Sequence, residues 1–192
     1  RLNTTGASNT AVGKDSLGAN TTGTRNVAVG ASAGLSITTG SYNVLMGTFT
    51  GDAITTGEQN AAFGDAALSA NTTGTDNVAI GDQALKVNTT ASNNTAVGSS
   101  ALLANTTGTA NVAVGMNALT ANTTADDNTA LGKGTLGTNT TGASNTGLGR
   151  AALAANTTAS NNTAVGSSAL TANTTGGDNV AIGMSSMLVN TT

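Results

Sequence analysis

Hydrophobic and polar positions recur along this chain every seventeen residues, from Asn3 to Thr192, with no insertion or deletion. Within residues 71–87, taken as a representative coil, the stretches 77–80 and 84–90 are β-compatible and too short for a stable helix. Strict spacing is typical of a solenoid, because every turn must stack on the one before. The pattern predicts an all-β parallel solenoid, or β-roll, with one coil per seventeen residues.

A three-residue turn follows each predicted strand, at 81–83 and at 74–76. The first of these turns begins with glycine in every coil, which predicts a positive φ that a β-carbon would resist. The second turn is less restricted, because alanine replaces its glycine in every second coil of the later array, so a strict left-handed conformation is not predicted there. The alternation indicates duplication of a two-coil unit; the alanines are Ala91, Ala125 and Ala159.

We call the residues at one position of successive coils a column, named by its member in residues 71–87. The Leu85 column is mostly leucine, whereas the Lys86 column varies and includes Gly, Asp, Ser, Lys and Thr, which predicts that leucine points inward and lysine outward. The Ile80 column is always large and apolar, and the Ala79 column is almost always alanine. Both faces of 77–80 are therefore expected to be buried, one inside the coil and one at a subunit interface. The sequence leaves open which face is interior.

The Asn77 column is asparagine in all eleven coils. Stacked asparagine side chains can hydrogen-bond from turn to turn, so we interpret this column as a structural ladder. The same interpretation applies to the Thr-Thr pairs, whose β-branched side chains suit strands.

Composition adds an expectation about assembly. The chain has 192 residues, rich in Ala, Thr, Asn and Gly, with only three aromatic residues. Small side chains give each coil little apolar area, and at roughly 25 cal/mol per Å² buried a lone chain is weakly stabilised. We therefore expect the rod to bury a second face against copies of itself, as a homotrimer. We interpret residues 1–192 as a single array of eleven coils from Asn3, with partial repeats at both ends, belonging to a longer fibre.

Charge and missing residue types exclude several classes. A net charge of −3, from six basic and nine acidic residues, predicts no nucleic-acid partner, and no apolar stretch is long enough to predict membrane insertion. Cysteine and histidine are absent, which removes disulfides, thiolate metal ligands and the commonest general base. We expect no cofactor and no metal.

Two pairs of like-charged residues are candidates for catalysis or ligand binding. Asp65 and Asp82 occupy one column in consecutive coils, about 4.8 Å apart if stacked, near the roughly 5–5.5 Å separation of carboxylates in retaining glycosidases. No histidine, tryptophan or second acidic column frames a cleft, so we interpret them as solvated turn residues and expect no enzyme. Lys133 and Arg150 form a comparable basic pair that could contact an anionic glycan.

The third and fourth coils are irregular, since Ile37 and Ile54 replace asparagine there. All three aromatic residues lie in these coils and form a candidate surface-binding patch, although a divergent pair of repeats is the simpler explanation; they are Tyr42, Phe49 and Phe63.

Residues 94–108, Asn-Thr-Ala-Val-Gly-Ser-Ser-Ala-Leu-Leu-Ala-Asn-Thr-Thr-Gly, resemble the seventeen-residue repeats of phage tail-fibre-like proteins and of similar bacterial surface proteins. Residues 77–81, Asn-Val-Ala-Ile-Gly, are also similar to the shorter head repeat of trimeric autotransporter adhesins, which form parallel β-rolls. The resemblance implies a trimeric fibre on a virion or cell surface. It implies a structural shaft or adhesin segment that supports attachment, with a cell-surface glycan or receptor as partner.

An ice-binding solenoid that uses threonine ranks is the alternative. Adjacent residues of a strand point to opposite faces, so Thr72 and Thr73 are expected to diverge. The outward rank then reads Asn71-x-Thr73, whereas an ice-binding face needs Thr-x-Thr.

Overall fold

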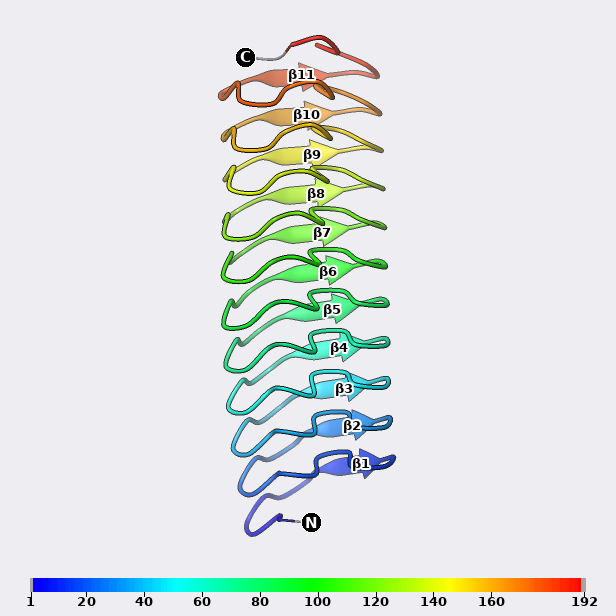
Figure 1. Ribbon diagram of the computed structural model, residues 1–192, viewed down its shortest axis with the longest axis vertical. Helices are drawn as coiled ribbons and strands as arrows, with labels where there is room; N and C mark the ends of the chain where they lie inside the picture. The colour runs from blue at the N-terminus through cyan, green and yellow to red at the C-terminus, as the bar shows by residue number, and fades with distance from the viewer. Residues whose placement is uncertain (1, 191–192) are drawn as a thin grey trace.

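The computed structural model describes residues 2–190 and is a parallel β-solenoid, with no helix among them. Its eleven strands form one sheet in chain order, stacked along the long axis of the molecule (Figure 1). The predicted all-β parallel solenoid with seventeen residues per coil is confirmed. The last Thr pair, Thr191 and Thr192, lies outside the described residues. The strands are β1 (Thr10–Val12), β2 (Val27–Val29), β3 (Val44–Met46), β4 (Ala61–Phe63), β5 (Val78–Ile80), β6 (Thr95–Val97), β7 (Val112–Val114), β8 (Thr129–Leu131), β9 (Thr146–Leu148), β10 (Thr163–Val165) and β11 (Val180–Ile182).

Columns of the sequence are columns in space. Ala79 of β5 pairs with Ala62 on one side and with Ala96 on the other, each seventeen residues away. Backbone hydrogen bonds outside the strands also join consecutive coils, as from Leu85 N to Ala101 O at 3.0 Å. Eleven coils that each rise about 4.8 Å make a rod roughly 50 Å long.

The prediction of a second strand over residues 84–90 is wrong. Residues 82–87 form consecutive turns, with Gln83 at φ +57° and Leu85 at φ +50°. A left-handed residue cannot continue an extended strand, and these two fold the chain so that Ala84 and Leu85 both point inward. Leu85 is buried as predicted, and Lys86 is half-buried on the outside.

Glycine in the turn after the strand has the predicted positive φ, +134° at Gly81. A β-carbon there would lie 2.6 Å from the carbonyl carbon of Gly98 in the next coil, so the position is restricted both by conformation and by space. At the other corner Gly74 is not left-handed, as expected, and the positive φ falls instead on Asp76.

The structure decides which face of the strand is interior. Ala79 is fully buried, while Ile80 is 41% exposed, so alternation along the strand places the alanine column inside and the Ile80 column outside. The interior is narrow, because the strand packs against the turn segments of its own coil and of the preceding coil. At Gly147 an added β-carbon would lie 2.5 Å from Thr135 Cγ2. A large side chain fits this column only at Leu45.

Two asparagine ladders run through the interior. The predicted Asn77 ladder is confirmed: Asn94 N donates to Asn77 Oδ1 at 3.0 Å. A second ladder follows the Asn71 column, where Asn88 Nδ2 donates to Asn71 Oδ1 at 3.0 Å. The ladders meet at one backbone carbonyl per coil, since Ala91 O accepts from both Asn77 Nδ2 and Asn88 Nδ2. Asn71 is fully buried, so its expected place in an outward rank is wrong.

Candidate functional site: the outer face of the sheet

The first and third residues of β1–β11 point away from the interior, and we call this surface the outer face. Its third position is large and apolar in every coil, and Ile80, Leu131 and Leu148 are each more than two-fifths exposed. In the eleven strands that the structure describes, no residue is charged. The outer face is thus a mostly apolar, uncharged strip along the stacked strands, in which the polar residues are threonines at the first position.

Sequence reasoning singled out the Ile80 column and missed the Val78 column, which forms the other half of the outer face. Its members are valine or threonine in every coil except at Ala61. This restriction to β-branched residues could have identified the column from the sequence, because β-branched residues suit a strand surface that is covered by neighbours.

Polar margins flank the strip. The turns after β4, β5, β8 and β9 carry Asp65, Asp82, Lys133 and Arg150, all exposed. The turn before each strand also carries charged residues. There the Arg25 guanidinium lies 5.2 Å from the centre of the Tyr42 ring and donates a hydrogen bond to its hydroxyl. Charged residues therefore occur beyond both ends of the described strands, and none lies within them.

The three aromatic residues do not gather in one patch. Tyr42 precedes β3 and Phe49 follows it, so they lie at opposite ends of that strand, about half exposed. Phe63 ends β4 and belongs to the outer face. The proposed surface-binding patch is thus distributed over three parts of the coil surface.

Asp65 and Asp82 lie in one column after β4 and β5, both exposed. The described hydrogen bond of Asp82 is local, from Gln83 Nε2 to Asp82 Oδ2 at 3.4 Å. Among residues 2–190 no cluster of three or more acidic side chains is arranged to hold a metal ion. The absence of catalysis and cofactors remains a prediction.

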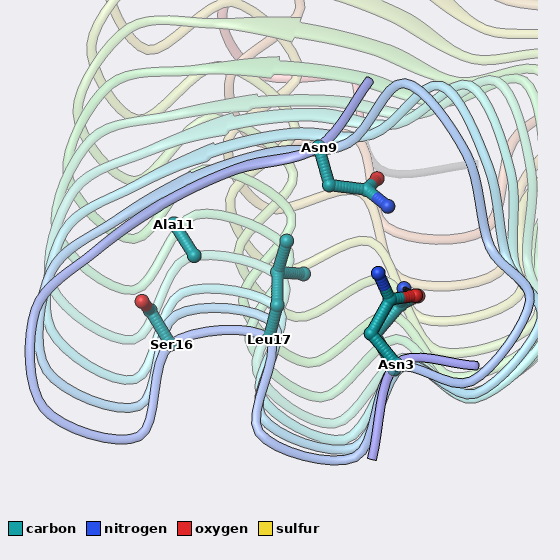
Figure 2. A pocket seen from close by; sticks show the side chains of 6 residues that line it. Asn3, Asn9, Ala11, Ser16 and Leu17 are labelled. Carbon is teal, nitrogen blue, oxygen red and sulfur yellow. Dashed lines mark hydrogen bonds between the residues drawn. The ribbon is translucent and has the colours of Figure 1, made fainter. Parts of the chain in front are cut away.

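A hollow of about 150 Å³ opens at the N-terminal end of the rod (Figure 2). Its lining side chains point into the coil and belong to the columns that line the interior in later coils. The hollow is therefore the solenoid interior seen end-on, and we assign it no ligand. Its lining comprises Asn3, Asn9, Ala11, Ser16, Leu17 and Asn20.

The environment of Asp52 shifts the titration of its carboxyl group. Burial disfavours its charged form and raises the pKa of this carboxyl, partly offset by a backbone hydrogen bond. Its Oδ1 is buried without a hydrogen-bond partner. Asp52 lies in the Lys86 column, away from the outer face.

Comparison with protein-family models, curated proteins and solved structures finds no match to this chain. The part of the chain that the structure describes contains no helix long and apolar enough to cross a membrane.

Proposed function

We propose that this chain is a non-enzymatic shaft segment of a fibre, from a phage tail or a bacterial surface, which holds an attachment tip away from the particle or cell. The single observation that carries the proposal is the uninterrupted register of eleven coils. The strictly repeated asparagines, such as Asn77 and Asn94, are joined by hydrogen bonds to the neighbouring coils and so serve the length of the rod.

The irregular third and fourth coils have a packing explanation. Gly34 of the second coil and Gly51 of the third replace leucine in the Leu85 column, which leaves space beside Ile37 and Ile54 inside the rod. A β-carbon at Gly34 would lie 3.0 Å from both Ile37 Cδ1 and Leu45 Cδ1, so these two side chains fill that space. Interior compensation accounts for the divergence without a ligand, which favours a shaft over a recognition module.

The threonine ranks give less support to ice binding. Thr72 Oγ1 donates to Thr89 O at 3.1 Å and so joins the coils, while Thr73 alone is exposed. An exposed single rank does not offer the two ranks that the ice-binding interpretation needs. A thermal-hysteresis measurement on the purified protein tests this alternative directly.

The fibre is proposed to be a homotrimer on a virion or cell surface, with any contact to a glycan or receptor made elsewhere along it. The test exposes the purified chain to bacterial cells and to a glycan array. We expect no saturable binding and no polysaccharide cleavage. The shaft proposal is wrong if binding occurs and is lost in Tyr42→Ala, Phe49→Ala or Phe63→Ala. It is equally wrong if cleavage occurs and is lost in an Asp65→Asn/Asp82→Asn double variant.

A further inference from the structure

We propose that the outer face is the surface through which copies of this chain assemble, parallel and in register coil by coil. The inference rests on the proposed fibre function and specifies its partner. It begins from an unpartnered apolar surface: Met46, Ile80 and Leu131 are each at least 40% exposed in the single chain. The charged residues near this surface lie beyond the ends of the strands.

The repeat of the outer face restricts what can cover it. Large apolar side chains recur at every coil, about 4.8 Å apart, along all eleven strands. A partner of another period would meet a few coils and then lose register. A second copy of this chain has the same period and can meet every coil, so it is the occupant that fits the whole strip.

Side-chain size supports apposition at the same level. Phe63 is the largest residue of the outer face and Ala61 the smallest, and both belong to β4. Around an axis parallel to the rod, the end of each strand approaches the start of the strand of the neighbouring copy. In register, Phe63 of one copy then lies beside Ala61 of the next, so a large side chain faces a small one.

The outer face of one copy is narrow. Each strand has three residues and is about 10 Å long, and the rod is roughly 50 Å long, so the face covers on the order of 500 Å² per copy. This area is below the roughly 800 Å² per partner of a standard stable interface, so we expect an assembly that a single charge on the face can weaken. The number of copies, three, is that of the proposed fibre.

The first test compares two matched substitutions. Ile80 on the outer face is 41% exposed and Val87 on the turn segment is 39% exposed, so Ile80→Asp and Val87→Asp introduce one charge at equal exposure. In analytical ultracentrifugation we expect the parent and Val87→Asp to assemble alike. We expect Ile80→Asp to raise the dissociation midpoint concentration at least tenfold. Equal assembly of both variants overturns the outer face as the interface while leaving the shaft function intact.

The second test does not depend on a variant that weakens the fibre. The chain has no cysteine, so Thr95→Cys combined with Val97→Cys places the only thiols on the outer face. Mild oxidation of the assembled protein should give covalent trimers, whereas the control Thr90→Cys/Thr124→Cys, which places two thiols on an exposed column elsewhere, should give no covalent species. Covalent dimers alone support the face and overturn the threefold arrangement. Absence of any covalent species overturns the face, and a folded parent monomer at micromolar concentration overturns self-assembly altogether.

Discussion

Individual residues carry unusual backbone conformations in this solenoid. Every coil has a left-handed residue in the Leu85 column, at φ between +47° and +58°, and all of these residues except Met187 are buried. The column contains leucine, glycine and, at Met187, methionine, but never valine or isoleucine. β-Branched side chains are the least compatible with positive φ, so the column combines a large apolar volume with an unbranched β-carbon.

This restriction predicts that two substitutions of similar volume differ in cost, because only one of them introduces a branched β-carbon. Leu102→Met should cost less than about 1.5 kcal/mol, because volume is conserved and Met187 adopts φ +49° in the same column. Leu102→Ile should cost about 1–3 kcal/mol more than Leu102→Met, because the branched β-carbon is strained at φ +50°. Urea unfolding of the two variants measures the difference. Equal losses would show that backbone conformation does not select this column.

Asp52 predicts a pH dependence of folding. Its pKa is raised above 3.8 in the folded chain, so the folded state keeps the proton at pH values where the unfolded state has lost it. The contribution of Asp52 to stability is therefore greatest below pH 3.8 and falls as the pH rises through the folded-state pKa. Asp52→Asn should raise the melting temperature at pH 7 and lose that advantage in acid.

Thermal melts of the parent and Asp52→Asn from pH 3 to 8 measure this effect. Ser69→Ala, in the same column of the next coil, changes no titratable group and serves as the control. A gap between parent and Asp52→Asn that stays constant across the range would contradict the burial argument.

At the level of elements, each coil consists of one strand and a turn segment packed directly on it. At one place a change in the turn segment accompanies a change in the strand that it contacts. The Ala84 column carries Thr135 in the eighth coil, and the Ala79 column carries Gly147 in the ninth. An added β-carbon at Gly147 would be 2.5 Å from Thr135 Cγ2, so the glycine makes room for the threonine methyl group.

The contact between Thr135 and Gly147 predicts that Gly147→Ala destabilises the parent chain but stabilises a chain that carries Thr135→Ala. Gly147→Ala alone should destabilise the fold by about 1–3 kcal/mol through overpacking. After Thr135→Ala, the same Gly147→Ala substitution should stabilise by about 0.5–1 kcal/mol, because alanine is favoured over glycine within a strand and restores the usual pair. A double-mutant cycle by chemical denaturation gives the coupling energy. Additive effects would show that the two side chains do not share this space.

The asparagine ladders also depend on matching residues in consecutive coils. At the third coil Ile37 replaces asparagine, and Asn20 Oδ1 is left buried without a hydrogen-bond partner. The substitution that fills the space beside Gly34 thus removes one rung, which shows that interior packing and the polar ladder draw on the same positions.

For the whole molecule, contacts between strands join only consecutive coils. Stability should then be roughly a sum over coils and their neighbouring interfaces. Deleting residues 91–124, two coils, joins Thr90 to Ala125 and keeps every column and the Gly–Ala alternation. We expect a cooperatively folded rod about 10 Å shorter, with a melting temperature within a few degrees of the parent.

Small-angle scattering and thermal melting test this expectation. Deletion of residues 99–124, one and a half coils, removes a turn segment and misaligns the columns, and it should lower the melting temperature strongly. If both deletions behave alike, the register between coils does not determine stability.

The sequence by itself determined the period, the parallel stacking, the Asn77 ladder, the buried Leu85 column and the glycine turn at Gly81. These features follow from spacing, because a strict repeat in a stacked coil turns sequence positions directly into columns. Tertiary structure alone decided two things. Gln83 and Leu85 have a left-handed backbone conformation, which cannot be read from residue types that favour β-strands. For this reason the segment predicted as a second strand is a turn segment. That segment makes the interior narrow, and a narrow interior admits alanine and excludes isoleucine. For that reason Ala79 lies inside the coil, Ile80 lies outside, and the rod carries an apolar outer face.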